Sequence, residues 1–407
     1  MFALHKSLSF QGAGGQAMKQ FYDVIVVGAG PAGSTAARVA AENGATVLML
    51  EKDREVGIPV RCAEAVGERG ILKVVKIKPE WISTKIKAVR LFAPNGAMIS
   101  VQHDDIGYVL DRKRFDYDLA MMAAKQGVDV MTRAYAYGLL EKDGFVAGVK
   151  FRHLNYDYQI GAKLVVGADG LESRVGRWAG LKTHLKLQDI ETCAQMTLTN
   201  LDLSSSHCDF YFSKQWAPGG YVWVFPKNKN SANVGLGISG EHAAYKAPIE
   251  YLREFIETHF SGASALTTVA GGVPCAPLME KIVANGLMLV GDAAHQANPI
   301  SGGGIVTGMI AAKIAGEVAA RAVNENNVTE KRLTEYSKLW EKNGGNVHRR
   351  AYRLKEAVYK LSDHDLNRTA ASLLKKTPEK HTIVNIFKTA LMQHPKLIPD
   401  VLKVFLG

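Results

Sequence analysis

The N-terminal part of the chain contains a complete strand–helix–strand unit, and this unit limits the fold more than any other feature. A β-branched apolar run at Tyr22–Gly28 predicts a buried parallel strand. It leads through a glycine-rich turn into an alanine-rich helix over Ser34–Asn43, and a second apolar strand over Thr46–Leu50 stops at Glu51. Strand, turn, helix, strand and acid in this order predict an α/β domain built on a parallel sheet.

The turn has the spacing of a dinucleotide-binding fingerprint. Gly28 permits the tight turn, Gly30 lets the backbone approach a pyrophosphate, and Gly33 lets the helix pack closely on the strand. Ala32 lies in the same turn, at a helix N-terminus whose free N–H groups favour phosphate. Glu51, 18 residues after Gly33, is placed to accept hydrogen bonds from ribose hydroxyls. The unit alone does not distinguish FAD from NAD.

Two later segments distinguish the two cofactors. Residues Lys163–Ser173 form an apolar strand that ends in a Gly-Ala-Asp-Gly turn, with Asp169 as its acid. Residues Ile282–Asp292 form another apolar strand that ends in an acid, and a glycine-rich stretch follows over Pro299–Ile305. In this order the segments resemble the aromatic-hydroxylase-like flavoprotein superfamily.

This resemblance implies a Rossmann-like, three-layer α/β domain that binds FAD. It gives Asp292 the role of holding the ribityl chain of the cofactor. It also places Gly304 and Ile305, at the start of the next helix, against the isoalloxazine, and it makes Asp169 a further FAD contact.

Other segments resemble the geranylgeranyl reductase family within this superfamily. The loop Val60–Ala65 carries a Cys–small–acid–small pattern, and Val109–Asp116 resembles the segment whose arginine contacts FAD. We choose Arg112 over Arg114 for that contact, and we expect the strand over Val130–Gly138 on the adenine side. The resemblance implies FAD contacts at Cys62, Ala63, Ala65, Arg112 and Ala136.

The segment Pro218–Pro226 fits the full PxxYxWxFP pattern that marks the geranylgeranyl reductase family. It lies in a stretch, Glu191–Gly240, whose alternation predicts an antiparallel sheet over the flavin. A period of two places Tyr221, Trp223 and Phe225 on one face of a strand. An aromatic wall of this kind suits a flat apolar polyene, so these three residues are the expected substrate contacts.

The family resemblance implies reduction of isolated C=C bonds in geranylgeranyl chains. Such a bond is not polarised, so hydride addition to one carbon needs an acid that protonates the other. Cys62, Tyr221 and the flavin itself are candidate proton donors, between which spacing does not decide. Trp223 is included with Cys62 and Tyr221 as a catalytic candidate, whereas His295 is interpreted as a helix-start residue with a local hydrogen bond.

The chain divides into five expected segments. Residues 1–20 are expected to form a disordered extension. FAD binding occupies residues 21–190 and resumes over residues 272–329. Residues 191–271 are expected to hold the antiparallel substrate sheet, and residues 330–407 a basic helical C-terminal region.

Positive charge is concentrated at the C-terminal end. The net charge is +11, and residues 330–407 hold 16 Lys+Arg against 8 Asp+Glu, or +8 of that total. Together with apolar residues near the end, including Phe405 and Leu406, this charge predicts a cytoplasmic enzyme that binds an anionic membrane surface peripherally. No nucleic-acid-binding motif is visible, and four isolated cysteines predict neither disulfides nor a metal site.

The substrate and the electron donor stay open at this level. A geranylgeranylated membrane phospholipid of the archaeal ether type is favoured, with free geranylgeranyl diphosphate and a chlorophyll or quinone precursor as alternatives. An FAD-dependent monooxygenase or halogenase on the same fold is a further alternative. No second nucleotide fingerprint is present, so we expect an external reductant such as ferredoxin or NAD(P)H.

Overall fold

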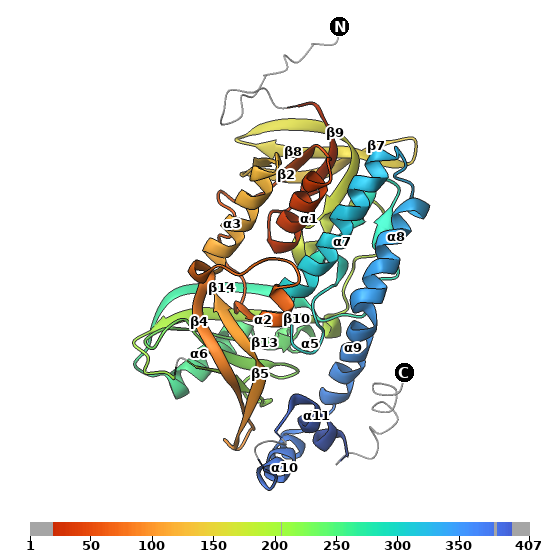
Figure 1. Cartoon of the computed structure of the whole chain (residues 1–407). Coiled ribbons are helices and arrows are strands. Elements are labelled where there is room, and N and C mark those ends of the chain that lie inside the picture. Colours follow the sequence, from red (N-terminus) through yellow and green to blue (C-terminus); the bar gives the residue numbers. More distant parts are fainter. Residues whose placement is uncertain (1–18, 205, 378–380, 393–407) are drawn as a thin grey trace.

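The computed structural model describes residues 19–204, 206–377 and 381–392. Two sheets lie one beyond the other along the molecule, and a long system of C-terminal helices runs past both (Figure 1). Residues 1–18 and 393–407 lie outside the described residues, and they contain most of the expected N-terminal extension and the terminal apolar residues Phe405 and Leu406.

The first sheet is the parallel sheet that the N-terminal unit predicts. Its main order is β15-β16-β9-β1-β2-β6, and β8 and β7 continue from β9 as antiparallel neighbours. The pairs β1–β2, β1–β9, β2–β6 and β9–β16 are all parallel. The strands are β1 (Phe21–Val27), β2 (Val47–Leu50), β6 (Asp129–Met131), β7 (Ala134–Lys142), β8 (Phe145–His153), β9 (Tyr156–Gly167), β15 (Val283–Ala284) and β16 (Leu287–Leu289).

Three helices cover one face of this sheet, as Figure 1 shows. They are α1 (Pro31–Glu42), α3 (Arg112–Lys125) and α7 (Ile305–Asn324). The antiparallel strands β7 and β8 contribute buried residues to the same hydrophobic core, among them Leu139, Val149 and Phe151. The predicted Rossmann-like, three-layer α/β class is confirmed.

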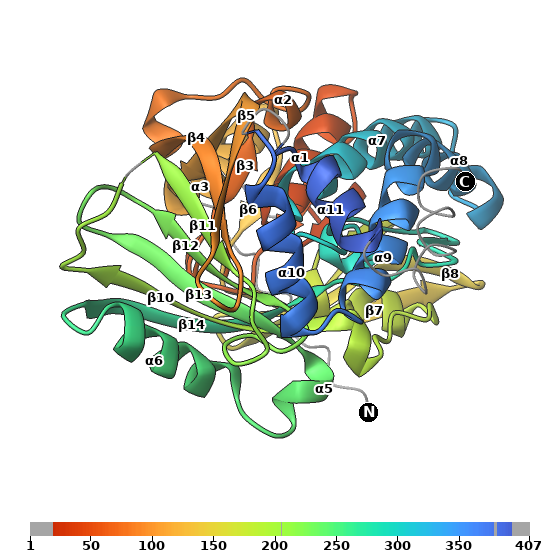
Figure 2. The same cartoon turned by 90° about the horizontal axis from the view of Figure 1, so that it is seen from below.

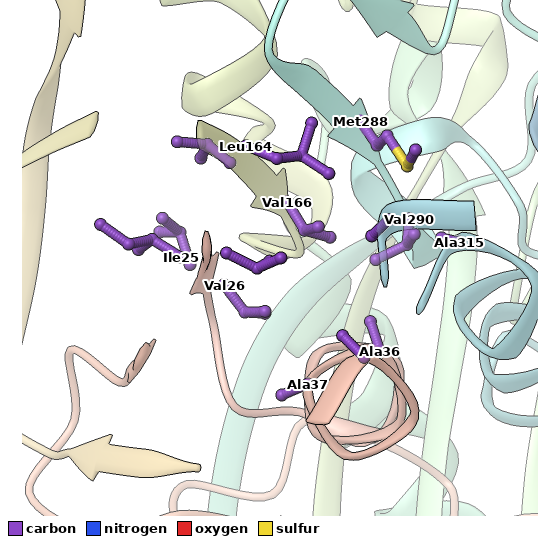
Figure 3. Packing of buried hydrophobic residues seen from close by; sticks show 14 of the residues in the cluster. Ile25, Val26, Ala36, Ala37, Leu164, Val166, Met288, Val290 and Ala315 are labelled. Carbon is purple, nitrogen blue, oxygen red and sulfur yellow. The ribbon is translucent and has the colours of Figure 1, made fainter. Parts of the chain in front are cut away.

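Small side chains let the helices approach the strands and each other closely. Ile25, Leu164 and Met288 are fully buried in this core (Figure 3). At the crossing of α1 and α7, a Cβ atom on Gly316 would lie 2.7 Å from the carbonyl oxygen of Ala36. Only glycine fits there, because close-packed interiors have no room for an added methyl group.

The second sheet is antiparallel apart from one parallel pair. Its order is β14-β10-β13-β12-β11-β4-β5-β3, and the parallel pair is β11–β4. The strands are β3 (Ala65–Gly67), β4 (Ile82–Phe92), β5 (Met98–Leu110), β10 (Ile190–Thr199), β11 (His207–Tyr211), β12 (Tyr221–Pro226), β13 (Ala232–Ser239) and β14 (Ser264–Pro274).

This sheet takes three strands from a part of the chain in which we expected only FAD binding. β3, β4 and β5 fall within residues 21–190, and they join the sheet through the pairing of β4 with β11. The sequence did not predict this arrangement, because Ala88 pairs with His207 and a pairing over so long a separation leaves no local pattern. The domain boundaries themselves stay a prediction.

The predicted alternation along β12 is confirmed. Val222 and Val224 point to one face, where Leu252 and Phe255 of α6 (Pro248–His259) cover them. Tyr221, Trp223 and Phe225 share a different cluster on the opposite face. The aromatic face therefore turns away from α6 and toward the first sheet.

The C-terminal part is helical, as predicted, over its described residues. It consists of α8 (Glu330–Trp340), a π-helical turn (Glu341–Gly345), α9 (Asn346–Val358), α10 (Asp363–Leu374) and α11 (Ile383–Met392). α8 and α9 form one long rod, and α10 lies across the far end of the second sheet, where Ala370 and Leu373 pack on Ile99 and Val101 of β5 (Figure 2). Among the described residues, no helix is both long enough and apolar enough to cross a bilayer.

Candidate active site

The glycine turn leaves an open, uncapped helix N-terminus. Gly28 has φ of +104°, and a Cβ atom on Gly33 would overlap the carbonyl oxygen of Gly28, so both positions require glycine. Around Gly30, by contrast, an added Cβ atom would meet nothing within 4 Å. Gly30 is the N-cap of α1, and no side chain caps this helix. The turn therefore has the free N–H groups and the space that a pyrophosphate needs.

Glu51 lies at the end of β2 and holds the turn in place. Its carboxylate accepts hydrogen bonds from the backbone N–H groups of Ala29, at 3.0 Å, and Asp53, at 2.9 Å. Its own carbonyl oxygen accepts from the N–H of Ala134, where β7 begins, and Ala136 is buried two residues further on. This arrangement fits the expected ribose and adenine corner of a bound FAD.

Asp292 follows β16 and faces the start of α7. A Cβ atom on Gly304, the N-cap of α7, would lie 3.0 Å from its Oδ1 atom, and half-buried Ile305 is the first residue of that helix. Burial raises the pKa of Asp292 to about 6, although the charge of Arg112 opposes this rise. Asp292 nevertheless keeps some accessible surface.

Asp169 has a more local role. Its Oδ2 atom accepts a hydrogen bond of 3.0 Å from the N–H of Val175 in α4 (Arg174–Trp178). Its Oδ1 atom is buried and has no hydrogen-bond partner among the described residues. Burial also raises the pKa of this carboxyl group. The orphaned oxygen leaves Asp169 able to accept from a bound cofactor, but one of its two oxygens is already used.

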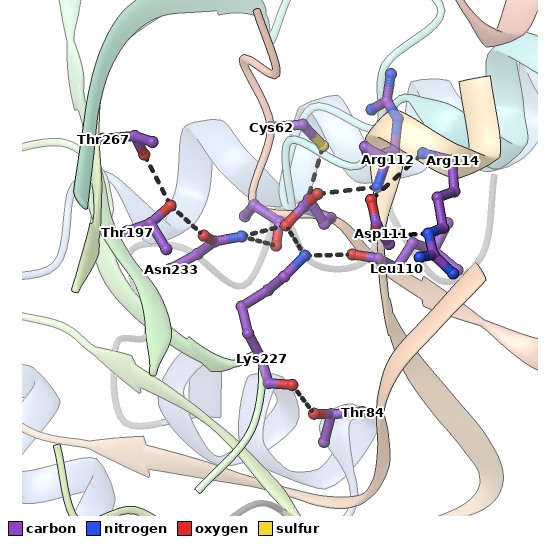
Figure 4. A network of polar contacts seen from close by, with 12 residues as sticks. Cys62, Thr84, Leu110, Asp111, Arg112, Arg114, Thr197, Lys227, Asn233 and Thr267 are labelled. Carbon is purple, nitrogen blue, oxygen red and sulfur yellow. Dashed lines mark hydrogen bonds and ion pairs between the residues drawn. The ribbon is translucent and has the colours of Figure 1, made fainter. Parts of the chain in front are cut away.

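A buried carboxylate fixes the loop that carries Cys62 (Figure 4). Glu64 accepts from Lys227 Nζ at 2.6 Å, from the backbone N–H of Arg112 at 3.1 Å and from Asn233 Nδ2. The carbonyl oxygen of Glu64 accepts from the N–H of Leu110 at 2.9 Å. Glu64 thus joins the Cys62–Ala65 loop to β5, to α3 and to the second sheet.

The thiol of Cys62 is kept neutral by its surroundings. Burial raises the pKa of Cys62 above its usual range, although the nearby charge of Arg112 acts in the opposite direction. The guanidinium of Arg112 makes two hydrogen bonds of 2.7 Å with Asp116 and is mostly buried, whereas Arg114 is exposed. Because the charge of Arg112 acts on both Cys62 and Asp292, these three groups lie at one site.

The aromatic face of β12 closes this site from the other side. The hydroxyl of Tyr221 donates to the carbonyl oxygen of Ser301, at 2.5 Å, in the loop before α7. Trp223 Nε1 donates to Gln195 Oε1, and Gln195 Nε2 donates to the carbonyl oxygen of Cys62, both at 3.0 Å. Trp223 is only 8% exposed, and through Gln195 it supports the Cys62 loop.

An apolar pocket of about 250 Å³ opens beside this face. Phe225 lines it, together with Phe210, which contacts both Phe225 and Tyr221 ring to ring. Tyr221 and Trp223 do not line this pocket. The lining residues are Ala65, Val66, Gly67, Ile86, Lys87, Ala88, Val89, Gly107, Tyr108, Cys208, Phe210 and Phe225.

His295 belongs to a different environment. It is buried with φ of +53°, its Nε2 atom has no partner among the described residues, and burial lowers its pKa. The groups that affect its pKa are the Thr183 backbone, His348 and Asp189, which belong to the contact with the C-terminal helices.

No local pattern in the sequence indicated the polar residues that position the Cys62 loop. Gln195, Lys227 and Asn233 connect the second sheet to the Cys62 loop, yet each is an isolated polar residue in a strand or at a strand end. The only signal was the acid Glu64 inside the Cys–small–acid–small pattern.

Similar proteins cover nearly the whole chain. Digeranylgeranylglycerophospholipid reductase 1 of Methanococcoides burtonii is 45% identical over 392 residues, which is 95% of this chain and 96% of that protein. The corresponding protein of Methanocella arvoryzae is also 45% identical, over 94% of this chain and 99% of its own. A crystal structure of a geranylgeranyl bacteriochlorophyll reductase-like protein from Thermoplasma acidophilum superposes with a TM-score of 0.89 at 36% identity, over 95% of this chain and 100% of that chain.

Two family models match parts of the chain. Residues 26–92 match an NAD(P)-binding Rossmann-like domain, and residues 189–273 match the geranylgeranyl reductase catalytic domain. Fold and site together define an FAD-dependent oxidoreductase of the Rossmann-like class. More specifically, the chain belongs to the geranylgeranyl reductase family. The expected cofactor and enzyme class are thereby confirmed, whereas the roles of individual residues stay predictions.

Replacing Gly30 with valine should remove FAD and leave the fold intact. The added side chain would occupy the open space at the N-terminus of α1 where the pyrophosphate is expected. The visible absorbance of the purified protein and its circular dichroism measure the two effects. Gly33→Ala is the control, and it should lose the fold itself because its Cβ atom would overlap the Gly28 backbone. A Gly30→Val protein that is fully loaded with FAD would contradict the assignment.

Asp292→Ala should weaken FAD binding more than Asp169→Ala does. A hydrogen bond to a charged group contributes about 1.5–3 kcal/mol, so we expect at least a tenfold rise in the dissociation constant for Asp292→Ala. Asp169→Ala should instead lower the melting temperature, since it removes the bond to Val175. Equal FAD dissociation constants for the two variants would reverse the ranking.

Proposed function

We propose that this protein reduces the isolated C=C bonds of geranylgeranyl chains on an archaeal-type ether phospholipid. The observation that carries this proposal is the apolar pocket beside Phe210 and Phe225, next to the Cys62 loop. The relatives named digeranylgeranylglycerophospholipid reductase, which match over nearly their full length, support the same substrate class.

The pocket suits a hydrocarbon chain and little else. Of the described residues that line it, only Lys87 carries a charge, and Lys87 is exposed at the surface. Burial of a prenyl chain stabilises the complex by about 0.8 kcal/mol for each CH₂ group removed from water. A polar aromatic substrate, as a monooxygenase or halogenase would take, has no matching set of hydrogen-bonding groups there.

The residues of the site have distinct tasks in this reaction. Gly30 and the N-terminus of α1 would hold the pyrophosphate, Glu51 the ribose, and Asp292 the ribityl chain. Bound and reduced FAD supplies the hydride. The neutral thiol of Cys62 and the face formed by Tyr221 border the reacting bond and exclude water, while an external reductant, such as ferredoxin or NAD(P)H, restores the flavin.

Free geranylgeranyl diphosphate and a chlorophyll or quinone precursor carry the same prenyl chain on different head groups. The pocket accommodates the prenyl chain and does not distinguish the head groups. An assay must therefore compare the ether phospholipid, the free diphosphate and the chlorophyll or quinone precursor directly. Free geranylgeranyl diphosphate is the most informative alternative substrate to test, because it is soluble without a membrane.

The wild-type protein, reduced under anaerobic conditions, should add hydrogen across the double bonds of the ether phospholipid in vesicles. Mass spectrometry of the extracted lipid measures the product. Val89→Trp should fill the pocket and lower kcat/KM about tenfold or more at unchanged flavin content, whereas Val89→Thr, of similar volume, should have little effect. Reduction of the free diphosphate in preference to the lipid would overturn the proposed substrate.

We also propose that the protein acts in the cytoplasm as a peripheral membrane enzyme. The excess of +8 over residues 330–407 supports this, although several of those cations are engaged. Lys355 is buried, and Arg332 is paired with Glu325 and Glu335. Lys375, which directly follows α10 beside exposed Leu374, is itself exposed.

Lys375→Glu should reduce co-sedimentation with anionic vesicles. Reversing one charge near the surface costs about 2 kcal/mol, at about 1 kcal/mol per unit charge, or roughly a thirtyfold lower partition coefficient. Lys142→Glu, an equal charge change at the exposed end of β7, is the control and should bind as the wild type does. Binding should also weaken as the Debye length falls from about 10 Å at 0.1 M salt to about 3 Å at 1 M. Equal binding to neutral and anionic vesicles would contradict the electrostatic attraction.

A further inference from the structure

A second pocket, polar in character, lies in the C-terminal helical region. It has a volume of about 270 Å³ and lies between α11 and the residues that directly follow α10. These two helices pack against each other (Figure 1). The pocket shares no lining residue with the apolar pocket of the second sheet. Its lining residues are Lys376, Asn385, Lys388, Thr389 and Met392.

The sequence of α11 gives the pocket a polar wall. Four of the five lining residues belong to this helix and recur at the spacing i, i+3, i+4 and i+7, so they lie on one side of it. The neighbouring side is apolar. Ile386 packs into a cluster with β5 and α10, and Phe387 and Ala390 pack into a cluster at the end of α9. The apolar side of α11 therefore attaches the helix to the protein and leaves the polar side to the pocket.

The ammonium group of Lys376 is held in a defined position. Its Nζ atom donates a hydrogen bond of 2.8 Å to Thr389 Oγ1. The hydroxyl of Thr389 in turn donates to the carbonyl oxygen of Asn385 at 2.7 Å, and Thr389 is only 8% exposed. An ammonium group carries three N–H donors, so two donors of Lys376 remain for a ligand.

Positive charge around the pocket is not balanced by nearby carboxylates. From residue 366 to residue 392, the described residues include Arg368, Lys375, Lys376 and Lys388 but no Asp or Glu. Glu379, the one acid of this stretch of sequence, lies outside the described residues. Neither Lys376 nor Lys388 forms an ion pair with a described residue, and two ammonium groups on one pocket favour an anion between them.

The chemistry of the lining favours a phosphate group that carries a hydrocarbon. A lysine ammonium is a compact point charge and a common ligand of phosphate. Met392 lines the pocket and is exposed, and Leu374, at the end of α10, is exposed as well. Cations beside exposed apolar side chains are typical of a surface that binds lipid. A free phosphate ion would leave both apolar side chains in water.

We propose that this pocket binds the phosphate group of a membrane phospholipid and thereby fixes how α10 and α11 meet the bilayer surface. The inference rests on the proposed peripheral membrane association and replaces a general attraction with a specific site. Lys376 and Lys388 contact the phosphate, Thr389 positions Lys376, and Met392 and Leu374 contact the lipid next to it.

Vesicles that differ only in the chemistry of their anion test this site. The vesicles consist of digalactosyldiacylglycerol, which is neutral and free of phosphate, with either phosphatidic acid or oleate added to the same surface potential. The FAD-loaded wild-type protein should co-sediment about tenfold more strongly with the phosphatidic acid vesicles, as one hydrogen bond to a charged group would give. Lys376→Gln, Lys388→Gln and Thr389→Val should each reduce this preference to about twofold or less.

Two features of this set of variants separate the site from general electrostatics. Thr389→Val leaves the net charge unchanged and removes only the hydroxyl that positions Lys376. Lys375→Gln is the matched control, because Lys375 is exposed next to the pocket but does not line it. Lys375→Gln should weaken binding to both kinds of vesicle about fivefold, the usual contribution of one cation near the surface, and leave the preference unchanged. Circular dichroism checks the fold of each variant, and the exposed Lys376 and Lys388 keep the test valid if Thr389→Val is unstable.

The possible outcomes distinguish this inference from the proposal on which it rests. Equal binding of the wild-type protein to both kinds of vesicle, or a preference that survives Lys376→Gln and Lys388→Gln, would overturn the phosphate site and leave membrane association standing. If the wild-type protein binds neither kind of vesicle, membrane association fails and the site fails with it.

A soluble ligand distinguishes a lipid phosphate from a free one. Calorimetric titration of the FAD-loaded protein with dihexanoyl phosphatidic acid should show binding that Lys376→Gln weakens about tenfold. Inorganic phosphate should bind more weakly, because it gains nothing from contact with Met392. Equally tight binding of inorganic phosphate would overturn the lipid as the ligand of this pocket.

Discussion

The buried carboxylate of Glu64 is the interaction on which the arrangement of the site depends. It accepts from Lys227 and Asn233 of the second sheet and from the backbone of Arg112 in α3, so a single side chain ties the Cys62 loop to both halves of the molecule. Such a group is stable only with all its partners, since loss of one member of a buried pair typically costs about 3–5 kcal/mol. The Cys62 loop and the apolar pocket therefore keep a fixed relative position.

The C-terminal helices complete the same site from outside the two sheets. One face of α9 and the residue after it carry a row of polar side chains that hydrogen-bond to the body of the protein. They are His348, Tyr352, Lys355 and Tyr359, and their partners lie close to Asp189 and Cys275. Because these hydrogen bonds are mostly buried, they fix the position of α9 on the body of the protein, which apolar contact alone would not do. A region that the composition describes as basic thus also brings Tyr359, the partner of Glu191, to the interior.

The sequence predicted the nucleotide-binding half well and the second half only in part. The glycine turn, Glu51, Asp169 and Asp292 were identifiable because each follows directly from a strand or helix end in a single segment. The aromatic alternation of β12 was equally local. The contribution of β3, β4 and β5 to the second sheet could not be predicted, because strands that pair across more than a hundred residues leave no pattern in either segment.

What the sequence determined by itself is the class of fold, the cofactor and the family, because these depend on short-range patterns that any chain with the same turns and strands would share. The tertiary structure alone decided the environment of each side chain. It placed Trp223 in a hydrogen bond to Gln195 and Phe225 in the lining of the pocket. It also buried Glu191 in a hydrogen bond with Tyr359. Burial and partners set the protonation and the reactivity of a group, and both arise only when distant segments pack together.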